Sequence, residues 1–130
     1  MSETILPGYE TVYITRPSLA DDALDSIHKK VESVITEFGG QIVEKEDWGN
    51  RKLAYDIQKE PRGHYTYVAY TGKPGVVHEI ERNFRINEHL LRFMTMNIAK
   101  EFSEEEFREN RQKQLEAFQA REERRRAARR

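Results

Sequence analysis

The sequence predicts an α+β fold, in which a four-stranded antiparallel sheet carries two helices on one face. Four segments show the alternation or the short apolar runs that are typical of strands. Two others repeat apolar residues at three- and four-residue spacing, which indicates amphipathic helices. Glycine and proline separate these segments. Their order along the chain is strand, helix, strand, strand, helix, strand.

The first strand and the first helix are predicted within residues 9–38. Residues 9–15 alternate Val12 and Ile14 with Tyr9, Thr11 and Tyr13, which is the pattern of a half-buried strand. If Val12 and Ile14 face the helices, the two tyrosines face the open side of the sheet. Gly39-Gly40 ends the helix that follows. The apolar stripe of that helix is Leu24, Ile27, Val31, Val34, Ile35 and Phe38.

The next two strands are predicted to form a hairpin. Residues 41–59 form a strand with a bend or bulge at Trp48-Gly49-Asn50. Pro61-Arg62-Gly63 has the composition of a turn, so residues 65–70 are expected to return antiparallel to the preceding strand.

A second helix and a last strand complete the fold. Lys73-Pro74-Gly75 opens the helix, and its apolar stripe is Val76, Val77, Ile80 and Phe84. Residues 90–98 are the last strand. The resulting order, βαββαβ, is that of a ferredoxin-like fold.

Three segments follow from this assignment: an N-terminal lead at 1–8, a ferredoxin-like domain at 9–98 and a tail at 99–130. The tail holds ten basic and eight acidic residues and few apolar ones. It is therefore either a solvated, partly helical or disordered extension, or an arm that becomes ordered on a partner.

The composition narrows the range of functions that the chain could have. The chain has 130 residues, no cysteine and four scattered histidines, so no metal or cofactor site is expected. It has neither a signal peptide nor an apolar run long enough to span a membrane, which predicts a cytoplasmic protein. The net charge is −1, yet residues 50–92 hold eight basic residues against five acids. A local basic surface is compatible with this distribution.

The strand at residues 65–70 is rich in tyrosine. Arg62-Gly63 followed by Tyr65, Tyr67 and Tyr70 is similar to the central-strand consensus of RNA-recognition domains, but His64 adds one residue to the spacing. Tyr65 and Tyr67 share one face and Tyr70 lies on the other, and the pattern leaves open which face is exposed. Exposed tyrosines in this strand would stack on RNA bases or contact a protein.

Several stretches together resemble ribosomal protein six of the bacterial small subunit. The most specific is Trp48-Gly49-Asn50-Arg51-Lys52-Leu53-Ala54-Tyr55, supported by Tyr9-Glu10-Thr11-Val12 and by Glu81-Arg82-Asn83-Phe84-Arg85, in the right order. The resemblance implies a structural protein of the ribosome. It also implies that the chain binds the central domain of small-subunit ribosomal RNA together with ribosomal protein eighteen.

Six residues are candidates for RNA contact on this basis: Tyr9, Arg51, Lys52, Arg82, Arg85 and Arg92. Each has a simpler interpretation. Arg51 and Lys52 suit a solvated strand edge, Arg82 and Arg85 suit an exposed helix flank, and Arg92 is a charge in an apolar strand. Leu6-Pro7-Gly8 replaces the basic residues that often precede Tyr9 in the family.

Other functions have less support. A single-stranded RNA reader would use Tyr65 and Tyr67 as its platform. An acylphosphatase-like enzyme would need a glycine-rich phosphate loop, which Arg16-Pro17-Ser18-Leu19 lacks. A small-ligand regulatory domain of similar topology is a third class, and no glycine-rich loop at a strand end favours it.

Overall fold

The computed structural model describes residues 6–128. The elements are β1 (Gly8–Thr15), α1 (Asp21–Glu37), β2 (Ile42–Ile57), β3 (Glu60–Thr71), α2 (Val76–Arg85), β4 (Leu90–Ala99) and α3 (Glu104–Ala128). The predicted order of strands and helices through residue 99 is confirmed. Residues 1–5 of the predicted lead and residues 129 and 130 of the predicted tail lie outside the described part of the chain.

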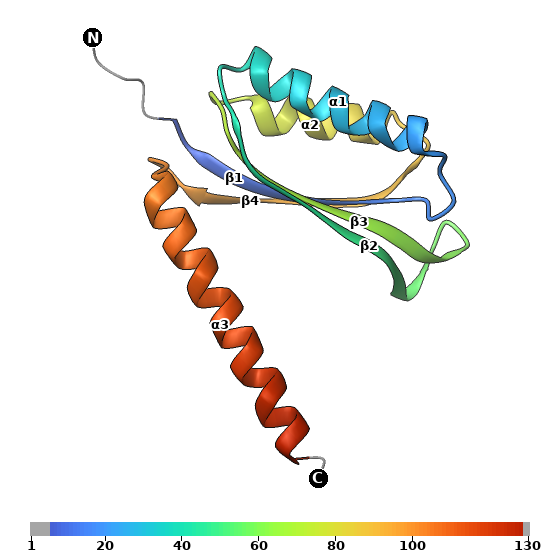
Figure 1. The fold of residues 1–130 in the computed structure, drawn as a ribbon. Coiled ribbons are helices and arrows are strands. Elements are labelled where there is room, and N and C mark those ends of the chain that lie inside the picture. The colour runs from blue at the N-terminus through green and yellow to red at the C-terminus, as the bar shows by residue number, and fades with distance from the viewer. Residues whose placement is uncertain (1–5, 129–130) are drawn as a thin grey trace.

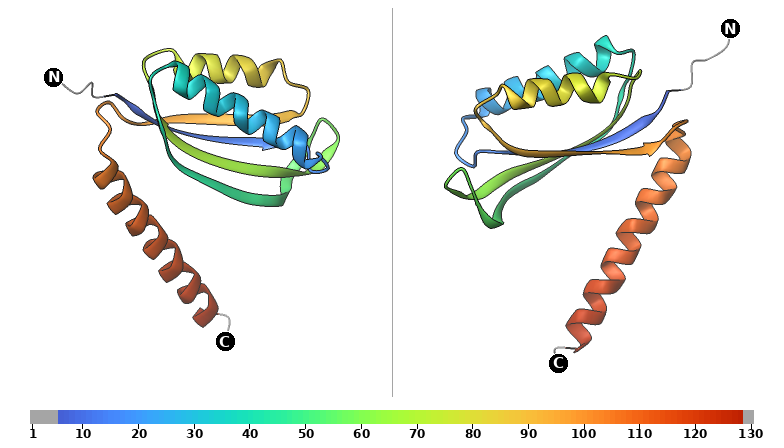
Figure 2. Two further views of the ribbon diagram at one scale, coloured as in Figure 1. Left: turned by 45° about the horizontal axis from the view of Figure 1, so that its top comes forward. Right: turned by 180° about the vertical axis from the view of Figure 1, so that it is seen from behind.

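The four strands form one antiparallel sheet in the order β2-β3-β1-β4. Helices α1 and α2 lie side by side on one face of the sheet (Figure 1). This is the predicted ferredoxin-like arrangement. Helix α3 lies on the opposite side and diverges from the sheet toward its C-terminal end in every view (Figure 2). The face turned away from α1 and α2 is called the open face below.

The main core lies between the sheet and the helices α1 and α2. It is built from Tyr13, Val68, Tyr70 and Leu90 on the strands and from Ile27, Val31, Val34, Ile35, Val76, Ile80 and Phe84 on the helices or at their starts. The stripes predicted for both helices supply most of these side chains. Burial of this apolar surface is the main stabilising contribution to the fold.

Several hydroxyl groups within this core are paired with one another or with a ring nitrogen. The hydroxyl oxygen of Thr11 lies 2.8 Å from those of both Tyr70 and Thr95, and the Tyr13 hydroxyl lies 2.6 Å from Nδ1 of His28. Burial raises the pKa of Tyr70 to about 12, although the hydrogen bonds with Thr11 and Thr95 oppose that rise. Hydrogen bonds of this kind offset the cost of burying hydroxyl groups.

The pattern of β1 left open which of its faces is turned to the helices, and the structure shows that Val12 and Ile14 are not on that face. Tyr9, Thr11 and Tyr13 pair in register with Tyr70, Val68 and Thr66 and face the helices. Ile14 instead packs on the open face with Leu53 and Leu91. Both faces of β1 are therefore covered, so the alternation of apolar side chains does not identify the helix side.

The predicted position of the hairpin turn was wrong. Gln58 and Lys59, with φ of 49° and 66°, connect β2 to β3, and Ile57 pairs with Glu60. Two consecutive residues with positive φ give a turn whose twist matches that of the flanking strands. Pro61-Arg62-Gly63 lies within β3. The bend predicted at Trp48-Gly49-Asn50 is confirmed by a shift of register between Asp47 and Gly49.

Candidate nucleic-acid and partner interface

The open face carries both aromatic and apolar side chains. The cross-strand pairs place Tyr65, Tyr67, Val12, Met94 and Met96 on this face. This arrangement answers the question that the tyrosine pattern left open, since Tyr70 lies between the sheet and the helices whereas Tyr65 and Tyr67 lie on the open face.

Tyr67 is covered although it faces away from α1 and α2. The indole ring of Trp48 stacks on it with a centroid distance of 5.4 Å and an interplanar angle of 9°. The guanidinium of Arg111 lies 4.7 Å from its ring centroid, and its hydroxyl donates a hydrogen bond to Glu10. Only 3% of Tyr67 is exposed. The pKa of this tyrosine is raised above its ordinary value, mainly by burial and secondly by the carboxylate of Glu10.

Arg111 comes from α3 and attaches this helix to the sheet. Its Nη2 donates to both carboxylate oxygens of Glu46, at 2.6 and 2.7 Å. Glu46 also accepts a 2.9 Å hydrogen bond from Nε1 of Trp48. Burial alone would raise the pKa of Glu46. The hydrogen bonds from Arg111 and Trp48 outweigh this effect, so the pKa lies below its ordinary value. Trp48, Glu46, Tyr67 and Arg111 thus form one connected network.

A second contact lies where α3 begins. The ring of Phe102 covers Gly8 at the start of β1 and packs on Phe107 of α3 with a centroid distance of 5.7 Å. The backbone N–H of Phe102 donates to the carbonyl of Leu6 at 2.9 Å. Arg108 adds an ion pair with Glu44 at 3.6 Å. The pattern of the sequence did not indicate that this tail would cover the sheet.

Three of the six predicted contact residues are exposed cations on the strands. Arg51 donates from Nε to the carbonyl oxygen of Trp48 at 3.1 Å, and its guanidinium lies 5.8 Å from the indole centroid. Lys52 follows it on β2, and Arg92 pairs in register with Ile14 on β4. None of these three takes part in an ion pair within residues 6–128.

Arg82 and Arg85 lie on α2 and are paired within that helix. Arg82 binds Glu79 at 2.6 Å, and Arg85 lies 3.7 Å from Glu81. The guanidinium of Arg85 also lies 5.9 Å from the ring centroid of Phe93. Both side chains remain exposed.

The structure does not join the six residues into one patch. Arg51 and Arg92 belong to β2 and β4, the two edges of the sheet, which are three strand spacings, or about 14 Å, apart. Arg82 and Arg85 lie in the helical layer. Tyr9 packs on Tyr70 at 5.8 Å on the helix side, so its ring is part of the sheet-helix packing.

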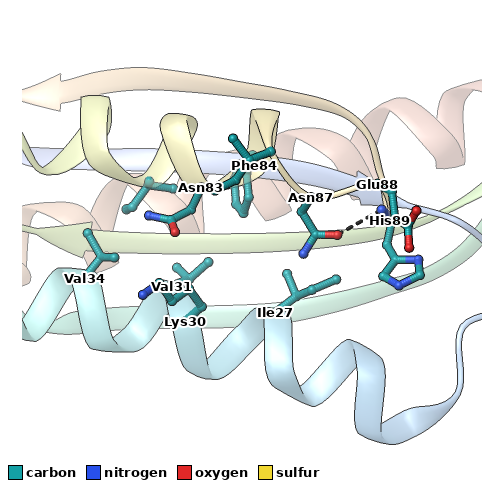
Figure 3. Close-up of a pocket in the computed structure, with 11 residues that line it drawn as sticks. Ile27, Lys30, Val31, Val34, Asn83, Phe84, Asn87, Glu88 and His89 are labelled. Atoms are coloured by element: carbon teal, nitrogen blue, oxygen red, sulfur yellow. Dashed lines mark hydrogen bonds between the residues drawn. The ribbon is translucent and has the colours of Figure 1, made fainter.

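A cavity that the sequence pattern did not indicate lies between α1 and α2, as Figure 3 shows. Its volume is about 480 Å³. Ile27, Val31, Val34, Ile80 and Phe84 form its apolar walls, and Lys30, Asn83, Asn87, Glu88 and His89 form its polar edge. The Asn87 side chain is already used, because its oxygen accepts the backbone N–H of His89 at 2.9 Å.

No helix within residues 6–128 combines the length and the apolar content required to cross a membrane. In the same part of the chain, no group of three or more His, Asp and Glu side chains is arranged to hold a metal ion.

The topology and the covered aromatic sheet define a protein of the ferredoxin-like class. The family model for ribosomal protein S6 matches residues 8–97, and the chain belongs to this family. The resemblance seen in the sequence is thereby confirmed.

Similar proteins agree with this family assignment, and a solved structure shares the fold. The chain is 40% identical to the small ribosomal subunit protein bS6 of Desulforapulum autotrophicum over 75% of its own length and 63% of that relative. It is 44% identical to the bS6 of Trichlorobacter lovleyi, over 72% of this chain and 76% of the relative. The crystal structure of 30S ribosomal protein S6 from Thermotoga maritima has the same fold, with a TM-score of 0.66 and 24% identity over 84% of this chain and 98% of that one.

Family membership determines the general role. The chain is a structural component of the small ribosomal subunit, located on the ribosome in the cytoplasm. It is not an enzyme, as the sequence analysis predicted.

Proposed function

We propose that the chain binds the central domain of small-subunit ribosomal RNA together with ribosomal protein eighteen. Membership of the ribosomal protein S6 family is the observation that carries this proposal. In this proposal the domain at residues 9–98 makes the RNA contacts, and the tail at 99–130 is not required for them.

The exposed cations support the RNA part of the proposal. Arg51, Lys52 and Arg92 have no carboxylate partner within residues 6–128, so their charges are available to phosphates. Arg82 and Arg85 each have to give up an ion pair with a glutamate of α2 before they can bind a phosphate. Tyr9 is kept in the proposal as an RNA contact because it lies near the start of β1.

Coverage of the aromatic strand argues against the single-stranded RNA alternative. A base that stacks on Tyr67 would have to displace Trp48 or Arg111. An RNA-recognition platform needs exposed aromatic faces. Charge contacts to folded RNA require no such displacement.

A gel-shift titration tests the proposal. A central-domain RNA fragment is titrated with the chain, with ribosomal protein eighteen, and with both. We expect tight binding only when both proteins are present, and an affinity that falls steeply as salt rises. An affinity unaffected by salt contradicts the charge-based contact. Binding of an unstructured RNA by the chain alone supports the stacking alternative instead.

A further inference from the structure

The cavity between α1 and α2 has two apolar walls. Ile27, Val31 and Val34 recur at four- and three-residue spacing on one side of α1. Ile80 and Phe84 of α2 form the facing wall. The volume of about 480 Å³ lies within the range of ~300–1,000 Å³ that is typical of small-molecule sites, which combine a mostly apolar lining with a few polar groups. The cavity therefore has the size and lining of a ligand site.

The cavity is narrow and reaches the surface. The exposed fractions of the wall side chains do not exceed 5%, whereas Ile86, just beyond α2, also lines the cavity and is 72% exposed. The wall on α1, from Ile27 to Val34, extends about 10 Å along the helix axis. A slender apolar chain fits this shape.

Asn87 presents a free hydrogen-bond donor to the cavity. The backbone N–H of His89 engages only Oδ1 of Asn87, at 2.9 Å, and this contact determines the orientation of the amide. Nδ2 of Asn87 donates no hydrogen bond within residues 6–128, and Figure 3 shows it turned toward α1. An amide NH₂ group can only donate, so it suits an acceptor such as a carboxylate oxygen.

Lys30 supplies a positive charge to the same cavity. It forms no ion pair within residues 6–128. The charge of nearby Glu79 is already matched by Arg82, at 2.6 Å. Glu88 is the one carboxylate among the lining residues, and Figure 3 places it on the other side of Asn87 from Lys30. An anionic group is therefore favoured on the Lys30 side.

We infer that this cavity binds a small amphipathic carboxylate. The carboxylate group lies between the ammonium of Lys30 and Nδ2 of Asn87, and the apolar chain lies against the two walls. Burial of the chain supplies affinity, and charge-assisted hydrogen bonds select an anion over a neutral analogue. The site lies on the helical side of the sheet, so the inference does not depend on the RNA and protein contacts proposed above.

Octanoate is the probe that tests this inference. It is titrated into the isotope-labelled full-length chain, and the chemical shifts of the backbone amides are followed by NMR. We expect saturable shifts at residues 27–34 and 80–89, with a dissociation constant below about 1 mM. 1-Octanol keeps the chain without the charge and should bind about fivefold more weakly or less. Acetate keeps the charge without the chain and should give no saturable shift.

Two substitutions remove the polar contacts. Lys30→Gln removes the charge, and its matched control Lys29→Gln removes the neighbouring exposed lysine, which does not line the cavity. Asn87→Asp keeps an oxygen for the N–H of His89 but replaces the free donor with a second carboxylate oxygen. We expect Lys30→Gln and Asn87→Asp each to weaken octanoate binding at least fivefold, and Lys29→Gln to change it less than twofold. Circular dichroism and urea unfolding establish that each variant is folded.

The competing outcomes are distinct. Absence of saturable octanoate shifts at the cavity residues overturns the inference, as do shifts confined to the open face. Equal affinity for octanoate and 1-octanol would mean that no carboxylate is recognised, which also overturns it. An equal loss in Lys29→Gln and Lys30→Gln would assign the effect to the general charge of α1 rather than to the cavity, with the same consequence. Because no RNA or partner protein is present, failure of the proposed function would not change any of these results.

Discussion

Arg111 and Glu46 are 65 residues apart in the sequence, yet a single guanidinium nitrogen of Arg111 donates to both carboxylate oxygens of Glu46. No residue of α3 is fully buried among the described residues of the helix. The helix is therefore held against the sheet mainly by this polar contact and by the aromatic packing of Phe102 and Phe107.

Replacement of Arg111 should release α3 without unfolding the domain. Arg111→Ala removes the contacts with Glu46 and Tyr67, which we expect to lower the local free energy of opening by about 1–2 kcal/mol. Hydrogen exchange should accelerate in the first turns of α3 while protection of β1 and β3 is kept. Arg121→Ala removes a charge from the exposed part of the helix and is the control. Equal exchange in all three proteins would show that Arg111 does not hold the helix.

Acid should release α3 through Glu46. The hydrogen bonds from Arg111 and Trp48 hold the pKa of Glu46 below its ordinary value of 4.5, against the effect of burial. A carboxylate with a lowered pKa contributes stability that is complete above the unfolded value and is lost as pH falls through the folded value. The attachment of α3 to the sheet should therefore weaken below about pH 4.5.

Fluorescence of Trp48, the only tryptophan of the chain, reports this change. We expect its emission to shift between pH 6 and pH 3 before the circular dichroism signal of the domain changes. In Glu46→Gln the early shift should be absent, because the titrating group is gone. An unchanged shift in that variant would assign the effect to another carboxylate.

The order of strands and helices could be predicted because each segment has a clear period and a clear boundary. Gly39-Gly40 and Gly75 lie at the predicted helix boundaries, and the stripes ending in Phe38 and Phe84 pack against the sheet. The faces of β1 could not be predicted, since Tyr13 and Ile14 point in opposite directions and are both buried. Burial of both faces removes the information that alternation normally carries.

The candidate site was less predictable than the fold. Arg51, Lys52 and Arg92 were found as exposed cations because family resemblance pointed to them, whereas their distribution over two sheet edges depends on strand order. The polar attachment of α3 depends on Arg108 and Arg111, in a helix rich in charges of both signs. A long-range polar contact of this kind leaves no periodic signal in the sequence.

Two glycines should respond differently to alanine. A Cβ at Gly40 would overlap the backbone carbonyl of Thr71, which cannot move without disturbing the end of β3. At Gly49 the surrounding space is open, and only its φ of +77° opposes a side chain. We expect Gly40→Ala to cost about 3 kcal/mol or more and Gly49→Ala about 1 kcal/mol, measured by urea unfolding. The reverse order would refute this account of the turn after α1.

Tyr70 should limit stability in alkali. Burial raises its pKa to about 12, so the unfolded chain ionises near pH 10 before the folded one. A raised pKa gives stability that is complete below pH 10 and is lost as pH rises toward 12. Tyr70→Phe should cost about 1 kcal/mol at neutral pH, through loss of the Thr11 contact, and should lose less stability than the unmodified protein between pH 9 and pH 11. Urea unfolding across this range measures both effects, and equal losses in the two proteins would contradict the role of Tyr70.

The paired and unpaired arginines should contribute unequally to RNA affinity. Arg51 and Arg92 have no carboxylate partner among residues 6–128, whereas Arg82 and Arg85 are held by Glu79 and Glu81. We therefore expect Arg51→Gln with Arg92→Gln to weaken binding of the central-domain RNA more than Arg82→Gln with Arg85→Gln. The gel shift is performed with ribosomal protein eighteen present, and folding is checked by circular dichroism.

The salt dependence distinguishes phosphate contact from a general effect of charge. Each lost phosphate contact should reduce the slope of log affinity against log salt by about 0.9 if the contacted RNA is helical. Lys113→Gln on α3 removes one cation outside the six candidates and should leave the slope unchanged. A loss of affinity with an unchanged slope would mean that Arg51 and Arg92 act through protein contacts. A larger loss from the Arg82 and Arg85 pair would mean that RNA binding breaks their ion pairs and that the helical layer carries the main contact.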